Sequence, residues 1–550
     1  METSKRANFI QCYASATGPD WGRWSKQRLK ISYPSMTEES QASSDGFMAG
    51  NGKTVVFRAD GGPGIGGGHI ARCLSLARTL TDSGFSCAFA LSPESASVVP
   101  TRLRSDFTWA EVACPPEQEA EVLRRIWPHG CDLLVVDHYG RNAGFESSCR
   151  GWASRILVID DLADRKHDCD YLLDASPGAS RNDYLDLVPP GCRLLVGPDY
   201  ALLRPEFMRF RGQSVARRAQ QRGLKRVFAC FGALDDRRLL PEVMDVVCGL
   251  DDALEMDVAV RRGVPHLDQI RQGAAQHGQR VQVHIDASNI AELMARADLG
   301  IGAAGGVALE GCCVGLPSVL FTTAANQQRN ALALEAAGAA LRLQLDGLRP
   351  FQRALKDEIR LLVKHPGKLS VMSEKATKIC DGRGALRLLL EITSSRIPIQ
   401  GKEIRLRLAR NSDTTTIYNW QKHPITRKHF RNPLIPSWNE HVEWMKNVLS
   451  DPDRMLFVIE AENNPVGTLR LDTKRQQNGM EFFEISIMTA PKLHGRGIAK
   501  TAVLKALKLF PGKAFLAEVL PGNIVSQALF HSIGFNLIDE NTFLLLGEDN

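Results

Sequence analysis

The chain has 550 residues, which is too long for one domain, so roughly three domains are expected. Its hydrophobic content of 44% and charged content of 24% are ordinary for a soluble globular protein, and a net charge of +6 is small for this length. The two short basic patches, Arg217–Arg226 and Lys492–Lys500, lack interleaved aromatic residues, which argues against nucleic-acid binding.

Residues 1–50 are polar and rich in Ser, Lys and Arg, without clear periodicity or an apolar core segment. We predict a disordered extension or an overlong start, with Met36 or Met48 as alternative first residues, and no signal peptide. Nothing in this stretch carries chemistry that the sequence lets us name.

The first predicted domain, residues 53–212, alternates helix-like stretches with apolar runs: Val55–Phe57, Cys87–Leu91, Leu133–Val136, Ile156–Ile159, Tyr171–Leu173 and Leu194–Val196. Such alternation predicts a parallel, Rossmann-like sheet with helices on its faces. Ligands of such sheets bind beyond the carboxyl ends of the strands. The polar residues after two of the runs, Asp137-His138-Tyr139 and Asp160-Asp161, are therefore candidate site residues.

A glycine-rich stretch, Arg58–Arg72 (RADGGPGIGGGHIAR), follows the first run and opens a helix. Glycines such as Gly68 let the backbone approach a ligand, and the helix N-terminus offers free N–H groups to an anion. His69 lies near Arg58, Asp60 and Arg72, and a histidine beside a carboxylate can act as a general base. A purely structural turn explains the loop alone equally well.

The second predicted domain, residues 226–393, repeats the pattern, and we interpret Arg217–Arg226 as a solvated connection to it. Its runs are Val227–Phe231, Met256–Val260, Val281–Val283, Leu299–Ile301 and Ser318–Phe321. Gly305-Gly306 opens a helix that suits a diphosphate, with Glu310 one turn further for a ribose, although an acidic residue there also stabilises a helix dipole. Two such halves form a cleft suited to a nucleotide-sugar.

A polar break at 394–402 precedes the third predicted domain, residues 403–548. Its runs Phe457–Glu460, Gly467–Leu471 and Phe482–Met488 indicate consecutive antiparallel strands. A glycine motif, residues 494–499 (HGRGIA), then opens a helix to Leu509. We predict a separate α+β domain.

Two chain-wide features bear on the compartment and on metals. The 13 cysteines are scattered and include no C-x-x-C pair, which argues for a reducing cytosol and against zinc. The most apolar long window, Ile301–Phe321, is interrupted by Glu310 and Pro317, so no membrane span is predicted. Asp160 and Asp161 are adjacent and point two ways, so no metal site is predicted either. We therefore predict a cytoplasmic protein that is not inserted in a membrane.

Residues 53 to about 345 resemble the UDP-sugar hydrolases of pseudaminic acid biosynthesis, which are relatives of the GT-B glycosyltransferases. The matching segments occur in order: RADGGPGIGGGHIARCLSLA, VVDHYG, ILVIDDLADRKHDCDYLLDA, LLVGPDYALLRPEF, NIAELMARADLGIGAAGGVALEGCCVGLPSV and ANQQRNA. That family releases UDP from UDP-2,4-diacetamido-2,4,6-trideoxy-β-L-altrose by attack of water at the anomeric carbon, without a metal.

The resemblance implies that His69 activates the water and that Tyr139 and Asn326 lie near the sugar. Ala325 stands where the family often has Asp, and Gly306-Val307 replaces a serine-containing pair, departures that bear on substrate choice more than on the reaction. The predicted substrate-binding residues are Arg58, Asp60, Gly68, Arg72, Gly305, Gly306, Glu310, Asn326 and Gln327.

The third domain resembles the GNAT acetyltransferases that act on amino-sugars. The resemblance rests on FEISIMTAPKLHGRGIA, AEVLPGNIVSQALFHSIGF and an upstream W-x-x-HP segment. It implies acetyl-CoA as cosubstrate, with Glu484 as a candidate base. Phe530 replaces the tyrosine that protonates the departing thiolate in many relatives, and His494 replaces the usual Arg or Gln. The predicted cofactor-binding residues are His494, Gly495, Arg496, Gly497, Ala499 and Asn523.

The sequence therefore predicts an α/β protein, a GT-B-like pair of Rossmann-like domains followed by an α+β GNAT domain. The predicted function is bifunctional: hydrolysis of a UDP-diacetamido-trideoxy-hexose and acetyl-CoA-dependent N-acetylation of its amino-sugar precursor. Other enzymes of the nonulosonic acid pathway are candidate partners. Two alternatives stay open, a GT-B glycosyltransferase that needs an acceptor and a nucleotide-sugar-binding protein with an inactive GNAT domain.

Overall fold

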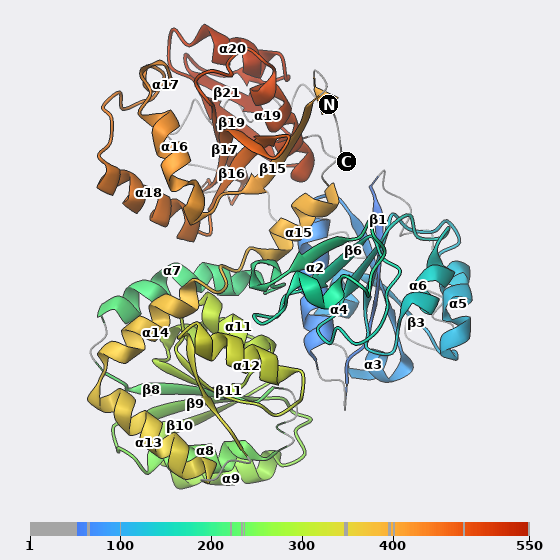
Figure 1. Ribbon diagram of the computed structural model, residues 1–550, viewed down its shortest axis with the longest axis vertical. Helices are drawn as coiled ribbons and strands as arrows, with labels where there is room; N and C mark the ends of the chain where they lie inside the picture. The colour runs from blue at the N-terminus through green and yellow to red at the C-terminus, as the bar shows by residue number, and fades with distance from the viewer. Residues whose placement is uncertain are drawn as a thin grey trace, which may run out of the picture.

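The computed structural model describes residues 52–547 apart from 63–66, 99–100, 221–222, 233–234, 236, 346–349, 394–397, 400–401 and 477–478. The predicted extension, residues 1–50, lies outside the described residues. Three sheets with their helices form three bodies, and Figure 1 shows the first at the right, the second below and the third above.

The first body has a seven-stranded sheet in the order β3-β2-β1-β4-β5-β6-β7, with all neighbours parallel. Its six apolar strands are those that the sequence predicts, whereas β3 was missed because this edge strand is half-exposed and carries no apolar run. The strands are β1 (Thr54–Ala59), β2 (Ser86–Leu91), β3 (Thr108–Glu111), β4 (Leu133–Asp137), β5 (Ile156–Ile159), β6 (Tyr171–Asp174) and β7 (Arg193–Val196). The helices include α2 (Gly68–Thr81), α3 (Pro93–Val98), α4 (Thr101–Asp106), α5 (Glu119–Ile126) and α6 (Ala143–Cys149), with the short 3₁₀ turn η3 (Arg181–Tyr184).

The second body has a six-stranded parallel sheet in the order β10-β9-β8-β11-β12-β13. Again an edge strand, β13, was missed because two of its four residues are only partly buried. The strands are β8 (Arg226–Cys230), β9 (Glu255–Val260), β10 (Val281–Ile285), β11 (Leu299–Ala303), β12 (Ser318–Phe321) and β13 (Ala340–Leu343). The helices are α8 (Leu239–Cys248), α9 (Leu267–Gln276), α10 (Ile290–Arg296), α11 (Gly306–Cys313), α12 (Gln327–Ala336), α13 (Phe351–Lys364) and α14 (Gly367–Thr377).

Helix α7 (Pro205–Gln220) connects the two halves, and part of the predicted solvated connection lies within it. That prediction is wrong for Arg218, which is only 4% exposed. Its guanidinium donates hydrogen bonds to the carbonyls of Met294, Ala297 and Val314. Carbonyls at helix ends have no partner within the helix and attract cations, so the arginine fastens α7 to the second half.

The third body is an eight-stranded mixed sheet in the order β14-β15-β16-β17-β18-β19-β21-β20. Only β18 and β19 pair in parallel, and they do so at three positions before they diverge. The strands are β14 (Pro398–Ile399), β15 (Lys402–Leu408), β16 (Arg454–Ala461), β17 (Asn464–Arg475), β18 (Glu481–Thr489), β19 (Ala514–Glu518), β20 (Asn536–Leu537) and β21 (Thr542–Leu545). The helices are α16 (Thr414–Gln421), α17 (Pro424–Arg427), α18 (Trp438–Ser450), α19 (Ile498–Leu509) and α20 (Ile524–His531).

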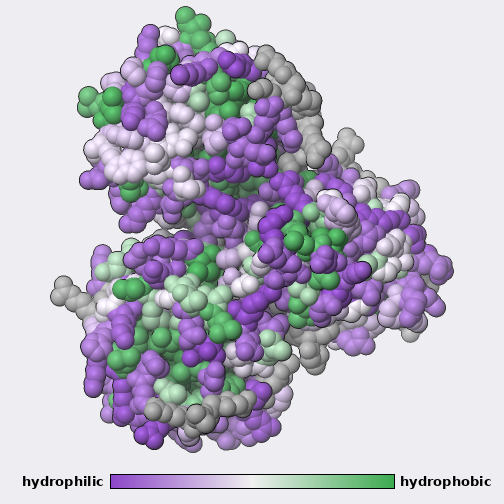
Figure 2. Space-filling model, in the orientation of Figure 1, coloured by the Kyte–Doolittle hydropathy of each residue, from purple (hydrophilic) through white to green (hydrophobic). Residues whose placement is uncertain are grey.

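Helix α15 (Gly384–Thr393) brings the chain back from the second half to the first, where it packs near α2. Its buried Leu388 and Leu389 join one hydrophobic cluster with residues of the first sheet and of the third body. Arg410 adds an ion pair of 2.9 Å to Asp199 of the first half. Figure 2 shows an open notch between the third body and the second half, so the third body rests mainly on the first half and α15.

In the part of the chain that the structure describes, no helix is both long and apolar enough to cross a membrane.

Candidate active sites

His69 and Asp137 form a buried pair at the carboxyl edge of the first sheet. His69 lies in the first turn of α2 and is 5% exposed, and Asp137 ends β4 and is fully buried. The distance from Nδ1 of His69 to Oδ1 of Asp137 is 2.5 Å. A carboxylate at this nitrogen fixes the proton on Nδ1, which leaves the lone pair on Nε2. Among the described residues none is hydrogen-bonded to Nε2, so it is available to accept a proton.

Arg72 holds the carboxylate of this pair in place. Its Nε and Nη2 each donate to Asp137 at 2.6 Å, and its Nη1 donates to Asp161 at 3.1 Å. Burial raises the pKa of Asp137, but the charges of Arg72 and His69 outweigh it and hold the pKa well below its usual range. Asp137 is therefore ionised and can stabilise an imidazolium on His69.

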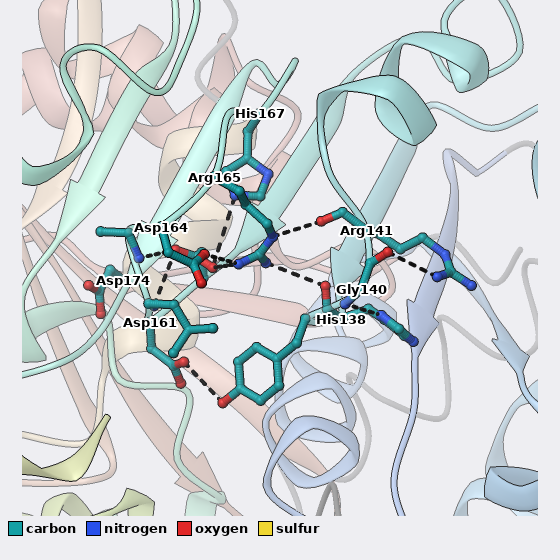
Figure 3. Close-up of polar contacts among 12 residues, drawn as sticks. His138, Gly140, Arg141, Asp161, Asp164, Arg165, His167 and Asp174 are labelled. Atoms are coloured by element: carbon teal, nitrogen blue, oxygen red, sulfur yellow. Dashed lines mark hydrogen bonds and ion pairs between the residues drawn. The ribbon is translucent and has the colours of Figure 1, made fainter. Parts of the chain in front are cut away.

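Tyr139 lies where the two halves meet. Its ring packs edge-on against His69 with centroids 4.7 Å apart. Its hydroxyl donates to Asp161 at 3.1 Å, the dashed contact at Asp161 in Figure 3. From the second half, Nδ2 of Asn326 donates to the same hydroxyl at 3.4 Å. Burial and the nearby Asp161 raise the pKa of Tyr139, so it stays a neutral phenol. His69, Tyr139 and Asn326, which the sequence predicts near one sugar, do meet at one place.

Arg58 and Asp60 lie at the end of β1, close to His138, the residue before Tyr139. Arg58 is 2% exposed, and its guanidinium contacts Glu119 at 2.6 Å and Asp60 at 2.8 Å. Asp60 in turn is 3.1 Å from the imidazole of His138. Because both charged groups are paired inside the protein, this geometry favours a structural role at the end of β1 over the predicted contact with substrate.

The second half contributes the N-terminus of α11. Gly305 precedes the helix and Gly306 begins it, while Glu310 is paired with Arg204 at 3.3 Å. Burial raises the pKa of Glu310, against the opposing charge of Arg204. The amide oxygen of Gln327 accepts from the backbone N–H and the hydroxyl of Thr323, both at 3.0 Å, so this oxygen orders its own loop.

Arg261 is a cleft residue that the sequence analysis missed. It follows β9 and reaches the first half, where its Nη2 lies 3.8 Å from the point that a Cβ on Gly67 would occupy. Its guanidinium makes no hydrogen bond or ion pair with a described residue. A Cβ on the adjacent Gly68 would meet open space. A polar residue directly after a predicted strand was the signal that could have identified Arg261.

In the third body, the glycine motif forms the entrance to α19. Gly495 and Gly497 have φ of +76° and +75°, a region that side chains disfavour, and Gly497 is the N-cap of the helix. His494 and Arg496 are exposed beside them, and Ala499 lies within the first turn. The loop thus presents unpaired N–H groups to an anion. Asn523 accepts from the N–H of Ser526 at 3.2 Å and caps α20, so its carbonyl oxygen is already engaged.

Glu484 lies at the last paired position of β18 and β19, where the two strands begin to diverge. Arg431 lies 3.0 Å and Lys474 3.4 Å from its carboxylate. Burial raises the pKa of Glu484, but these two cations outweigh it and the pKa lies below its usual range. Phe530 is 3% exposed and packs against Phe535 and Phe543, so this position supplies packing and no acid.

No group of three or more His, Cys, Asp or Glu side chains in the described ranges is arranged to hold a metal ion. The predicted metal-independent reaction stays a prediction.

Two parallel-sheet halves that meet through polar side chains, followed by a mixed sheet with a glycine loop, define a GT-B-like enzyme fused to a GNAT domain, which confirms the predicted fold class. Residues 403–536 match the model of the acetyltransferase (GNAT) domain, and residues 247–383 match the glycosyltransferase family 28 C-terminal domain. A GNAT domain implies acetyl-CoA as its cosubstrate.

Three proteins are similar to this chain, and two of them, the first and the third below, bear out the resemblance of the GT-B-like part. The UDP-2,4-diacetamido-2,4,6-trideoxy-beta-L-altropyranose hydrolase of Campylobacter jejuni is 29% identical over 241 residues, 44% of this chain and 81% of that protein. An uncharacterized protein of Methanocaldococcus jannaschii is 23% identical over 521 residues, 88% and 96% of the two chains. The spore coat polysaccharide biosynthesis protein SpsG of Bacillus subtilis is 25% identical over 343 residues, 61% and 96% of the two chains.

Proposed function

We propose that the GT-B-like part hydrolyses a UDP-diacetamido-trideoxy-hexose to the free sugar and UDP. The observation that carries the proposal is the buried His69–Asp137 pair, whose Nε2 is available beside Tyr139 and Asn326. The similarity to the Campylobacter jejuni hydrolase supports the choice of substrate class.

In the proposed reaction, Nε2 of His69 takes a proton from a water molecule as that water attacks the anomeric carbon. The bond between this carbon and the oxygen of the β-phosphate breaks, and UDP leaves with the electron pair. Asp137 stabilises the imidazolium that forms. The N-terminus of α11, together with Gly68 and Arg261, can neutralise the charge on the diphosphate, which makes UDP a good leaving group. Tyr139 and Asn326 orient the sugar.

The third body is proposed to acetylate the amino-sugar precursor before the hydrolysis. Acetyl-CoA supplies the acetyl group, and the residues at the glycine motif and α19 fit its pyrophosphate. Glu484 is a carboxylate at the point where β18 and β19 diverge, and its lowered pKa makes it a weak base that suits binding the ammonium of the acceptor. The ammonium loses its proton to water, the neutral amine attacks the acetyl carbon, and the bond between this carbon and the sulfur of CoA breaks. Because Phe530 has no acidic proton, water must protonate the departing thiolate.

Gly497→Ala tests the glycine motif. An alanine at a φ of +75° is strained by about 1–2 kcal/mol, so the affinity for CoA is expected to fall roughly tenfold. Isothermal titration with CoA measures this. Gly479→Ala is the matched control, because Gly479 has a φ of +83° in a hairpin remote from the motif. Equal CoA affinity in wild type and Gly497→Ala would show that the motif is not part of the CoA site.

The test of the hydrolase proposal is UDP release from the di-N-acetylated UDP-sugar by the full chain, with no acceptor and with a chelator present. Release under these conditions is the expected result. Release only after an acceptor alcohol is added would show a glycosyltransferase, and UDP binding without release would show a binding protein.

A further inference from the structure

Arg329 joins the two halves three residues after Asn326. Asn326 is the N-cap of α12 and Arg329 lies in the first turn of this helix. From there Nη2 of Arg329 donates to Asp174 at 2.9 Å and Nη1 donates to Asp183 at 2.8 Å, both in the first half. One guanidinium from the second half therefore bridges the end of β6 and the turn η3.

The contact is close and partly buried. Asp174 is fully buried. A Cβ on Gly178 of the first half would lie 2.5 Å from Cγ of Arg329 and 2.9 Å from its carbonyl oxygen, so only glycine permits this approach. Ion pairs with a buried partner are screened less by solvent than exposed ones.

Within the first half, hydrogen bonds connect Asp174, the partner of Arg329, to the residues around Tyr139. The hydroxyl of Tyr184 lies 2.9 Å from Asp174 and 3.1 Å from Asp160. The next residue, Asp161, accepts the hydrogen bond of Tyr139 (Figure 3). By contrast, the direct contact of Tyr139 with Asn326 is a single exposed hydrogen bond of 3.4 Å, which is too weak to hold two domains.

We propose that Arg329 is a positioning residue that locks the two halves in the arrangement where Asn326 meets Tyr139. The inference rests on the proposed hydrolysis, because it assigns Arg329 to the geometry of that site. Arg329 does not itself touch the sugar or the reacting water.

The test compares Arg329→Met with Arg342→Met, since Arg342 pairs with Glu335 inside the second half and with no other acidic residue that the structure describes. Misplacement by about 1 Å costs roughly 100-fold in rate, so kcat for UDP release is expected to fall about 100-fold in Arg329→Met. The affinity for UDP is expected to fall much less than kcat, because α11 and Arg261 both lie in the second half and only Gly68 lies in the first. Arg329→Lys restores part of kcat, since lysine keeps the charge but not the two-pronged geometry.

Two further measurements distinguish a role of Arg329 in fixing the arrangement of the two halves from a folding defect. Asp183→Asn keeps an oxygen for the N–H of Ser180 and loses the charge. The double variant Asp183→Asn with Arg329→Met should lose less kcat than the product of the two single losses, because both changes break the same contact. Hydrogen exchange without substrate should quicken in residues 171–184 and 327–336 of Arg329→Met but not of Arg342→Met.

Equal kcat in Arg329→Met and Arg342→Met would overturn the proposal, as would unchanged exchange. If the wild-type chain releases no UDP from the sugar, the proposed hydrolysis fails, and the exchange comparison alone then decides whether Arg329 holds the halves together.

Discussion

His69→Ala is expected to lower the rate of UDP release by about 10²- to 10⁴-fold, the usual contribution of a positioned general base. The structure places its Nδ1 on Asp137 at 2.5 Å, so the variant removes the only group in this pair that can take the proton of water. UDP affinity should stay unchanged, because the imidazole acts on the water and the diphosphate is proposed to lie against α11. Initial rates of UDP release and a UDP titration measure the two quantities.

His277→Ala provides the matched control, since His277 pairs with Asp245 in the second half, away from the cleft. Its rate should equal that of the wild type. Added imidazole should restore part of the activity of His69→Ala by entering the vacated space. A His69→Ala enzyme that keeps the wild-type rate would remove His69 from catalysis.

Asp137→Asn is expected to impair both turnover and stability. An asparagine can turn its NH₂ group toward Nδ1 of His69, which then accepts, so the proton moves to Nε2 and the base is lost. The rate should therefore approach that of His69→Ala. The change also removes one of the two carboxylates that Arg72 contacts, and because Asp161 remains, the cost lies at or below the ~3–5 kcal/mol of breaking a fully buried ion pair.

Asp137→Asn should also change how the stability of the folded chain depends on pH. The folded-state pKa of Asp137 lies below its ordinary value, so its contribution is present above the ordinary carboxyl pKa and is lost as the pH falls. Chemical denaturation of Asp137→Asn should therefore show a smaller loss of stability on acidification than the wild type.

Asp257→Asn separates the two effects. Asp257 is also fully buried and pairs with His284 and Arg296, but it lies in the second half outside the cleft. Both variants should lose stability, and only Asp137→Asn should lose turnover per folded molecule. Similar turnover in the two variants would contradict the assigned role of Asp137.

The buried strands were predictable because parallel sheets covered on both faces require continuous apolar runs, as in Ile156–Ile159. The edge strands β3 and β13 were not, since half-exposed residues carry no such run. Arg218 was misinterpreted for a related reason. Its positive charge predicts a side chain exposed to solvent, whereas the tertiary fold brings helix-end carbonyls to its guanidinium.

The candidate site was partly predictable. His69, Tyr139 and Asn326 could each be named from motifs, and the carboxyl-edge rule placed Asp137 in the same region. Sequence could not pair His69 with Asp137, 68 residues apart, because that contact depends on strand order. Nor could it show that Arg58 is buried in an ion pair with Glu119. The contacts of Arg261 and Arg329 with the first half also depend on the tertiary fold.

The central claim is that water attacks the anomeric carbon of a UDP-sugar in this cleft. Hydrolysis in ¹⁸O-labelled water, with the position of the label read by mass spectrometry, tests it directly. Attack at carbon puts the label in the released sugar and leaves UDP unlabelled, which is the expected result. Label in UDP would mean that a phosphorus–oxygen bond breaks instead, and would contradict the proposed mechanism.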